Sequence, residues 1–284
     1  MKLIENHINV KDYLTKSNLP LSDYVINPYI GCPHACIYCY ACFMKHFTGH
    51  IEDWGTFIDI KHTNKTINKK RLKGKFVLLS SVTDCYNQYE KKYKITRSIL
   101  EQMIAIDCNL TICTKSDLIL RDLDLLKQCK HLKVAISLNT LNDDFRKSIE
   151  SASSISARLH TLEQLHSHNI HTVLFMAPLF PYITDFKDII ECTSEYIDEY
   201  WFQSLNLSGS YQKNIMSFIK NEYPQLYSSY YDIYINKNNT YWNNLSDEIT
   251  SYCTTHHLNF TNFLNQRRYK TEQYFLEEIA NYSC

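Results

Sequence analysis

Several features of membrane and exported proteins are missing from this chain. No apolar run reaches about 18 residues, so no transmembrane helix is expected. Residues 1–10 carry charges but no apolar stretch of the kind that a secretory signal needs. Lysine plus arginine balance aspartate plus glutamate at 30 each, so no overall field attracts nucleic acid or membrane. Glycine is scarce, at 5, a bias that we attribute to AT-rich coding DNA rather than to function.

Cysteine, by contrast, is plentiful. Eleven cysteines in a chain without an export signal predict a reducing, cytoplasmic location, and an odd number does not suit a disulfide framework. The 284 residues are 44% hydrophobic and 21% charged, which is ordinary for a globular protein. This length predicts one large domain with a sizeable core.

Three of the cysteines, Cys32, Cys36 and Cys39, stand together in a C-x₃-C-x₂-C spacing. Three thiolates cannot close a tetrahedral zinc site, which needs a fourth ligand. They can hold three irons of a [4Fe–4S] cluster and leave the fourth iron open to bind and reduce another molecule. No C-x₂-C pair exists outside residues 32–42, which argues against a second cluster.

Other interpretations of these cysteines stay open. They could form a zinc knuckle or another structural zinc site, or an iron–sulfur module that only transfers electrons or senses oxidants. Cys42 is a tempting fourth ligand, but it falls three residues after Cys39 on a helix expected over 40–47. We therefore interpret Cys42 as a free thiol.

Downstream, the chain alternates short apolar runs with segments of helical spacing. Such regular alternation predicts a parallel sheet with right-handed crossovers, and six units give an α/β fold, a partial (βα)₆ barrel. The predicted strands are 24–30, 76–80, 110–114, 134–138, 171–176 and 201–205. The predicted helices among them are 40–47, 96–106, 122–129, 156–166 and 185–196, the last capped by Thr184 or Asp185.

We expect three regions: a loose lead-in over 1–22 with at most one short strand, a core barrel over 23–206, and a mostly helical extension over 207–284. In the extension we predict helices over 211–222, 242–256 and 271–280, and a short strand near Asn259. This extension is either a structural cover or part of the substrate mouth.

Residues 60–83 contain no acidic residue and carry a run of basic ones. Such a run can bind phosphates, but we favour a solvated helix or loop. The basic residues are Lys61, Lys65, Lys69, Lys70, Arg71, Lys73 and Lys75.

The frame around the three cysteines resembles the radical S-adenosylmethionine (SAM) superfamily. Residues 27–42 read NPYIGCPHACIYCYAC and residues 79–84 read LSSVTD. Both stretches are similar to the spore photoproduct lyase-like branch, and most similar to its radical SAM mobile pair proteins. The resemblance spans about 24–205 and implies a [4Fe–4S] cluster on Cys32, Cys36 and Cys39, whose free iron chelates SAM. It implies that an electron from the cluster cleaves SAM to a 5′-deoxyadenosyl radical, which abstracts hydrogen from a substrate.

The resemblance also implies SAM contacts at the carboxyl ends of the strands, where barrel enzymes carry their functional groups. Thr83 and Asp84 would meet the amino group of SAM, although Asp84 could instead fix its loop or cap a helix. Lys115 would pair with the carboxylate of SAM, and Ser137 would contact its ribose or carboxylate.

Two further elements complete the implied SAM site. Arg158 follows Glu150 at the spacing of the family's segment, although both prolines of that segment are lost, and it would hold either SAM or Glu150. Pro178 lies in an A-P-x-x-P element that would read the adenine together with Tyr38. The implied SAM-binding residues are thus Tyr38, Thr83, Asp84, Lys115, Ser137, Arg158 and Pro178.

One departure from the family pattern bears on the substrate. The spore photoproduct lyase has a hydrogen-donating Cys where this chain has Ser81, and a serine O–H bond is too strong for that role. Cys85 lies nearby, but we expect a core thiol there. Reversal of a DNA thymine dimer is therefore doubtful, and nucleic-acid repair or modification remains an alternative. The expected partners are SAM, an electron donor such as flavodoxin or ferredoxin, and a second radical SAM protein encoded nearby, with nucleic acid a weaker candidate and no membrane.

Overall fold

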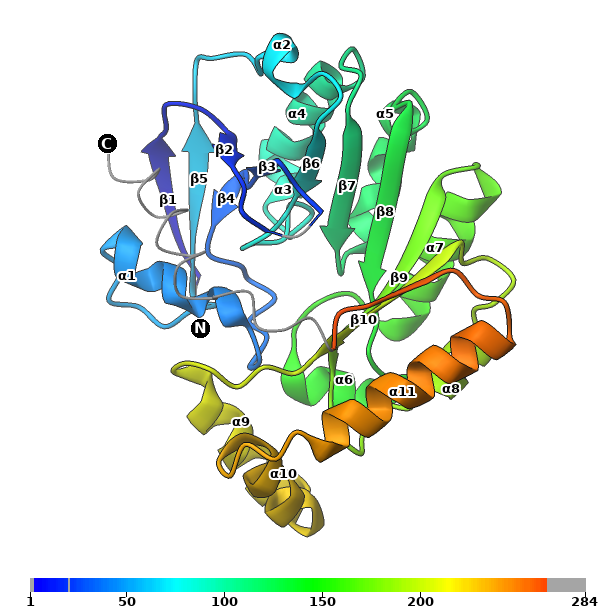
Figure 1. Ribbon diagram of the computed structural model, residues 1–284. Helices are drawn as coiled ribbons and strands as arrows, with labels where there is room; N and C mark the ends of the chain where they lie inside the picture. The colour runs from blue at the N-terminus through cyan, green and yellow to red at the C-terminus, as the bar shows by residue number, and fades with distance from the viewer. Residues whose placement is uncertain (1–2, 20, 265–284) are drawn as a thin grey trace.

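The computed structural model describes residues 3–19 and 21–264, which form two sheets and their covering helices (Figure 1). The larger sheet has eight strands in the order β11-β10-β9-β8-β7-β6-β3-β2, and the smaller has three in the order β1-β5-β4. In the larger sheet every neighbouring pair is parallel except β2 with β3. The strands are β1 (Ile4–Asn9), β2 (Leu14–Lys16), β3 (Tyr24–Ile26), β4 (Tyr29–Ile30), β5 (Phe57–His62), β6 (Phe76–Leu79), β7 (Asn109–Thr114), β8 (His131–Ser137), β9 (His171–Leu179), β10 (Glu199–Ser204) and β11 (Phe260–Asn262).

From β4 onward helices connect consecutive strands, and α4, α5 and α7 lie along one face of the larger sheet (Figure 1). The α-helices are α1 (Lys45–Thr48), α2 (Lys69–Leu72), α3 (Glu90–Tyr93), α4 (Ile95–Met103), α5 (Leu123–Leu126), α6 (Asp143–Ile149), α7 (Ile155–Ser167), α8 (Phe186–Glu191), α9 (Tyr211–Glu222), α10 (Tyr227–Tyr234) and α11 (Thr240–Thr255). Three 3₁₀ helices accompany them: η1 (Tyr40–Met44), η2 (Asp117–Asp122) and η3 (Pro224–Leu226).

The predicted barrel is confirmed as six parallel strands, β3 and β6 to β10, in sequence order. Most of their apolar residues are buried, as in a parallel sheet covered by helices, and Ile112, Ile136 and Leu174 are each 0% exposed. The sheet does not close on itself, because β2 and β11 stand at its two edges.

Local sequence explains where several helices begin. Asn142 accepts hydrogen bonds from the backbone N–H groups of Asp144 and Phe145 at the start of α6. Asp185 accepts two at the start of α8, which confirms one of the two predicted caps. Each such cap satisfies N–H groups that have no partner inside the helix.

The first predicted barrel strand, 24–30, is divided in two. Pro28 lacks a backbone N–H and cannot continue a hydrogen-bonded ladder, so β3 ends at Ile26 in the larger sheet and β4 joins the smaller one. The prediction for 171–176 was too short, because β9 runs on through Pro178 to Leu179. The helix expected over 122–129 is only the four-residue α5, preceded by η2.

Regions outside the barrel also differ from expectation. The lead-in contains two strands, and β1 pairs in parallel with β5 along six residues. Helix α10 was not predicted, whereas the strand near Asn259 is confirmed as β11, parallel to β10. The helix predicted over 271–280 lies outside the described residues. Within 3–19 and 21–264, none of the helices combines the length and apolarity needed to cross a membrane.

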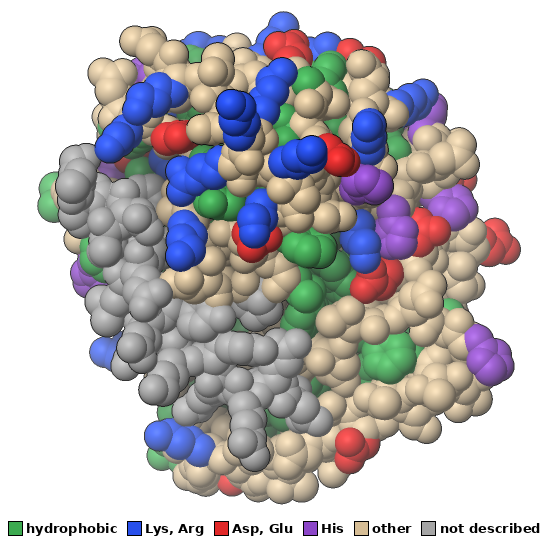
Figure 2. All heavy atoms as spheres, turned by 45° about the horizontal axis from the view of Figure 1, so that its top comes forward, with side chains coloured by type: hydrophobic (Ala, Val, Ile, Leu, Met, Phe, Trp, Pro, Cys, Tyr) green, Lys and Arg blue, Asp and Glu red, His purple; other side chains and the backbone are tan. Residues whose placement is uncertain are grey.

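The basic run is not one exposed segment. Lys61 lies in β5 and is only 4% exposed, whereas the other six basic residues are exposed in and around α2. Helix α2 precedes β6, so it lies at the amino-terminal edge of the barrel, and Figure 2 shows Lys and Arg side chains gathered over the forward-facing surface there. This surface faces away from the strand ends where the predicted site residues stand.

Candidate functional site

The three motif cysteines lie in residues 31–39, the cysteine loop, which follows β4. Cys32 is buried, Cys36 and Cys39 are half-buried, and all three are free thiols. The loop curls through positive φ at Gly31 (80°) and Ala35 (48°). A side chain at Gly31 would place its Cβ 2.4 Å from the carbonyl oxygen of Phe57, so only glycine fits this approach to β5.

The thiols lie close enough to affect one another electrostatically. Burial raises the pKa of Cys32 and of Cys36, and the neighbouring thiol groups raise both further. Burial also raises the pKa of Cys39, against which Lys115 acts. Three soft donors that lose their protons only when positive charge enters are suited to a bound metal centre, because thiolates form when a metal supplies that charge.

The thiols do not converge in the described chain as a finished ligand set. Among residues 3–19 and 21–264, no three His, Cys, Asp or Glu side chains are gathered as a metal-binding group. The predicted fit to a [4Fe–4S] cluster therefore depends on the donor set, which is three free thiols in one loop. Cys42 contacts Ser210, 3.6 Å from Sγ to Oγ, and its role as a thiol that is not a ligand stays a prediction.

A buried carboxylate, Glu150, ties the cysteine loop to the barrel. Its oxygens accept hydrogen bonds from the Tyr38 hydroxyl and the Arg158 guanidinium, and one lies 3.6 Å from Cys36 Sγ. Burial alone would raise the pKa of Glu150, but the charges of Arg158 and Lys115 lower it, so this carboxyl is ionised. Burial likewise opposes the charge on Lys115, yet Cys36 and Glu150 raise the pKa of its ammonium. Arg158 and Lys115 are thus the cations that act on the buried Glu150 carboxylate beside Cys36.

Asp84 is a second brace, between the cysteine loop and the ends of β6 and β7. Its carboxylate is 3.1 Å from His34 Nε2 and accepts hydrogen bonds from the Thr114 hydroxyl (2.7 Å) and the Lys115 backbone N–H (2.8 Å). Burial alone would raise the pKa of Asp84, but the His34 imidazole and these donors lower it to about 2. These contacts fix the loop that carries Asp84, and contact with the amino group of SAM stays a prediction.

The other predicted SAM-binding residues also stand at strand ends. Thr83, after β6, donates to the Gly31 carbonyl oxygen at 2.7 Å. Ser137 ends β8, and its carbonyl oxygen accepts from Arg158 at 3.0 Å. Pro178 lies in β9, and its carbonyl oxygen accepts from the Asn139 side chain at 3.0 Å.

Arg158 is 1% exposed, with hydrogen bonds to Ser153, Ser137 and Glu150. Of the two roles considered from sequence, the structure places its guanidinium on Glu150. Tyr38 packs edge-on against Phe180 just beyond β9, with ring centroids 5.6 Å apart.

Sequence reasoning did not single out two neighbours of the cysteines. His34 lies inside the motif, where its pairing with Asp84 depends on a contact 50 residues along the chain. Trp54, whose indole N–H is 3.2 Å from Cys39 Sγ, lies outside every recognised motif. No pattern in the sequence predicts either contact, because each joins segments that are separate in the sequence and adjacent only in the fold.

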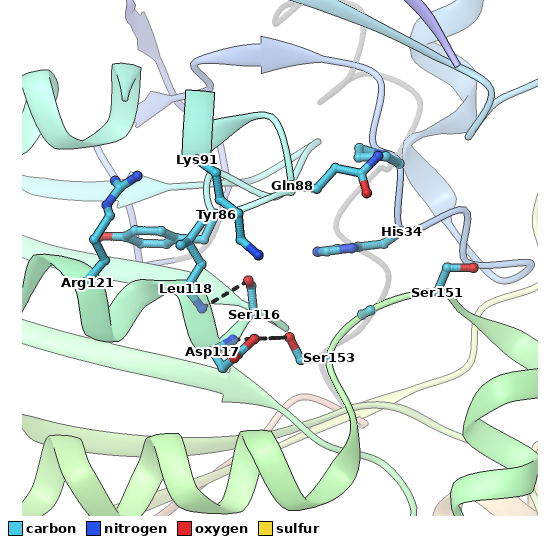
Figure 3. Close-up of a pocket in the computed structure, with 12 residues that line it drawn as sticks. His34, Tyr86, Gln88, Lys91, Ser116, Asp117, Leu118, Arg121, Ser151 and Ser153 are labelled. Atoms are coloured by element: carbon cyan, nitrogen blue, oxygen red, sulfur yellow. Dashed lines mark hydrogen bonds between the residues drawn. The ribbon is translucent and has the colours of Figure 1, made fainter. Parts of the chain in front are cut away.

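A cavity of about 410 Å³ opens on the outer side of the cysteine loop (Figure 3). Figure 3 shows Lys91 and His34 extending toward it from different sides, with Ser116 below the end of Lys91. Pro33 and His34 form part of its wall, so the cavity reaches the segment between Cys32 and Cys36 from solvent.

Comparison with known proteins identifies the family. The sequence profile of the radical SAM superfamily matches residues 26–192. The chain belongs to the radical SAM superfamily. It is therefore an enzyme that uses a [4Fe–4S] cluster and SAM. An uncharacterized protein of Methanocaldococcus jannaschii is 36% identical over 222 residues, 78% of this chain and 84% of that protein. An uncharacterized protein of Acidianus two-tailed virus is 35% identical over 175 residues, 57% of this chain and 58% of that one.

Solved structures show the same fold. Spore photoproduct lyase with bound AdoMet and dinucleoside spore photoproduct superposes with a TM-score of 0.57 at 15% identity, covering 78% of this chain and 66% of the lyase chain. Streptococcus suis SuiB bound to S-adenosylmethionine superposes with a TM-score of 0.52 at 15% identity, covering 87% of this chain and 52% of SuiB. At these identities the superpositions establish the radical SAM partial barrel and leave the substrate open.

Proposed function

We propose that Cys32, Cys36 and Cys39 hold the [4Fe–4S] cluster of this radical SAM enzyme, and that its substrate is larger than a metabolite. When bound, the cluster and SAM supply a 5′-deoxyadenosyl radical that abstracts hydrogen from the substrate. The observation that carries the ligand assignment is the set of three free thiols in one loop, braced from both sides by Glu150 and Asp84.

The protein's own residues prepare a place for SAM. We propose that the carboxylate of SAM binds the ammonium of Lys115, a buried cation at the end of β7 whose charge is favoured by the nearby Glu150. Thr83, after β6, and Ser137, at the end of β8, stand on either side of the end of β7 and would meet the amino group and the ribose. The rings of Tyr38 and Phe180, with the backbone at Pro178, form an apolar edge suited to the adenine.

The test compares four single variants. After anaerobic reconstitution, Cys32→Ala, Cys36→Ala and Cys39→Ala should each lose bound iron and the absorbance near 400 nm and release no 5′-deoxyadenosine with SAM and dithionite. Cys42→Ala is the matched control, three residues beyond the motif, and should keep all three properties. Loss of iron in Cys42→Ala alone, or stoichiometric zinc in place of iron, would overturn the assignment. An iron–sulfur module without SAM chemistry would hold iron but release no 5′-deoxyadenosine.

The substrate class is open between two kinds of macromolecule. One fold relative carries a dinucleoside spore photoproduct and another, SuiB, a precursor peptide. Thymine-dimer reversal by a lyase-type hydrogen donor is disfavoured here: Ser81 is buried and accepts from Asn27, and Cys85 is a fully buried core thiol. The exposed basic residues around α2 also stand away from the strand ends. We therefore favour a peptide or protein substrate, with nucleic acid as the alternative. Exposing the loaded enzyme and SAM to deuterated peptide or oligonucleotide pools decides between them, since only the true class transfers deuterium into 5′-deoxyadenosine.

We propose that an acidic electron carrier such as flavodoxin or ferredoxin docks at the cavity beside the cysteine loop. Lys91 projects there from an exposed position, and the loop between Cys32 and Cys36 is reachable. Lys91→Glu should slow SAM cleavage driven by the reduced carrier and leave cleavage driven by dithionite unchanged. Equal rates with both reductants would exclude this docking site.

Two remaining expectations concern the cell. All ten cysteines in the described part of the chain are free, in line with the proposed reducing cytoplasm. Pairing with a second radical SAM protein stays a prediction, and copurification with the product of the neighbouring gene would test it.

A further inference from the structure

One tryptophan outside the motif touches a motif cysteine. The indole N–H of Trp54 lies 3.2 Å from Cys39 Sγ, within the range of a hydrogen bond to sulfur, although 15 residues separate them. We propose that Trp54 donates this hydrogen bond in the loaded enzyme and thereby raises the reduction potential of the cluster. The inference rests on the proposed function of Cys39 as a ligand.

Residues 54–57 pack against the cysteine loop through three contacts, of which this hydrogen bond is one. A Cβ at Gly55 would lie 2.8 Å from the Cβ of Ala35, so the absence of a side chain there allows the two backbones to meet. Two residues on, the Phe57 carbonyl oxygen lies against Gly31, as described above. Trp54 therefore belongs to a segment whose position relative to the loop is set at both ends, and its indole does not depend on a single contact.

The aromatic stack behind Trp54 holds the indole in place. Trp54 packs edge-on against Phe57, with centroids 5.7 Å apart, and Phe57 stacks on His50 at 3.7 Å. His50 is itself held by Glu52 and Asp59, at 2.9 Å from each ring nitrogen. These contacts with the smaller sheet thus hold the indole of Trp54 with its N–H directed at Cys39 Sγ.

The sign of the effect follows from charge. Reduction adds an electron to the cluster and increases the negative charge on its cysteine sulfurs. An N–H dipole aimed at sulfur stabilises that charge, so the reduced form gains more than the oxidised form, and hydrogen bonds to sulfur are one of the determinants of cluster potential. Because an indole N–H is a donor only, the contact cannot reverse its polarity. Trp54 is accordingly a positioning and tuning residue that acts through Cys39.

The experiment measures the midpoint potential of the reconstituted cluster. Trp54→Phe keeps an aromatic ring against Phe57 and removes the N–H. We expect the ratio of reduced to oxidised cluster at a fixed applied potential to fall about tenfold, which for a one-electron couple is a shift of about 59 mV to more negative potential. Trp201→Phe is the matched control, because its indole N–H donates to Glu199 at 2.7 Å rather than to a cysteine, and its potential should equal that of the wild type.

A second measurement has its main readout in the wild type, which therefore does not depend on the folding of a variant. Enzyme labelled with ¹⁵N in the indole ring is reduced without SAM and studied by pulsed electron paramagnetic resonance. We expect a ¹⁵N coupling to the cluster spin in the wild type and in Trp201→Phe, and none in Trp54→Phe.

The outcomes separate the two proposals. A wild type with no iron refutes the proposed function itself. Clusters of normal iron content in wild type and Trp54→Phe, with equal potentials or no ¹⁵N coupling in the wild type, refute the role of Trp54 and leave the ligand assignment standing.

Discussion

Replacing Arg158 with methionine should strongly destabilise the protein although the residue lies outside the cysteine motif. The guanidinium is 1% exposed and its partner Glu150 is 4% exposed. Methionine fills similar space but leaves the Glu150 carboxylate buried without its main counter-charge, and it leaves the carbonyl oxygens of Ser137 and Ser153 without their donor.

The magnitude follows from the burial of the pair. Removing one partner of a buried ion pair costs about 3–5 kcal/mol, because the other charge stays desolvated. Tyr38 and Lys115 still stabilise Glu150, so we expect the lower end, about 3 kcal/mol. For a chain of this size that loss lowers the thermal midpoint by about 6–12 °C.

The assay is thermal unfolding of the metal-free chain under reducing conditions, followed by circular dichroism. Lys187→Met is the matched control, since it breaks a 2.6 Å pair with Glu248 whose side chains are 42% and 51% exposed. Such a surface pair contributes about 0–1 kcal/mol, so the thermal midpoint of Lys187→Met should stay close to that of the wild type. The variants Glu150→Gln and Arg158→Met/Glu150→Gln complete a double-mutant cycle, in which the pair should show a coupling of about 1–3 kcal/mol.

An Arg158→Met midpoint within about 2 °C of the wild type, below the shift expected for 1 kcal/mol, would refute the reasoning. So would additive losses in the cycle, because they would mean that Glu150 and Arg158 do not sense each other. Either result would mean that the buried Glu150–Arg158 ion pair does not stabilise the site.

Two further predictions concern the loops around the cysteines. The pKa of Asp84 is lowered from its ordinary 3.8 to about 2 in the folded chain, so its contribution of about 2 kcal/mol to folding is present above pH about 4 and lost as the pH falls toward 2. In urea titrations of the metal-free chain, Asp84→Asn should be less stable at neutral pH, and its free energy of unfolding should change less with pH between about 4 and about 2. A variant whose free energy of unfolding depends on pH as steeply as that of the wild type would contradict the assignment. Gly31→Ala forces a Cβ to 2.4 Å from the Phe57 carbonyl at a φ of +80°, whereas Gly49→Ala, at a φ of +70°, meets nothing within 4 Å. The Gly49 variant should cost about 1 kcal/mol and keep its iron, while the Gly31 variant should lose more stability and incorporate little iron; equal iron content in both would show that the loop does not need this close approach.

Much of this protein is readable from its sequence because the relevant signals are local. Short runs rich in apolar residues, separated by segments of helical spacing, predict the parallel strands β6 to β10, because much of each strand is buried under helices. The cysteine spacing is local too, since the three thiols stand within one loop. Side chains that cap helices, such as Asp185, act over three residues and are visible for the same reason.

The tertiary structure decided what depends on contacts between distant segments. The sequence left open whether Asp84 and Arg158 meet SAM or neighbouring side chains. In the folded chain Asp84 contacts His34 and Arg158 contacts Glu150. Those contacts exist only because the cysteine loop returns to the ends of β6 and β7 and to the segment before α7. The smaller sheet was invisible for a similar reason, since β1 and β5 pair across about 50 residues and their alternation is masked by the buried Lys61 and Asp59.

The chemistry of the site divides in the same way. Residue types and spacing within one loop determined which cofactors the enzyme uses, because soft thiolates in this pattern suit an iron–sulfur cluster with an open iron. The environment of those thiols, by contrast, comes from β5, the ends of β6 and β7, and the Glu150–Arg158 pair. Charge, burial and hydrogen bonding depend on distances in space, and only the folded chain sets those distances.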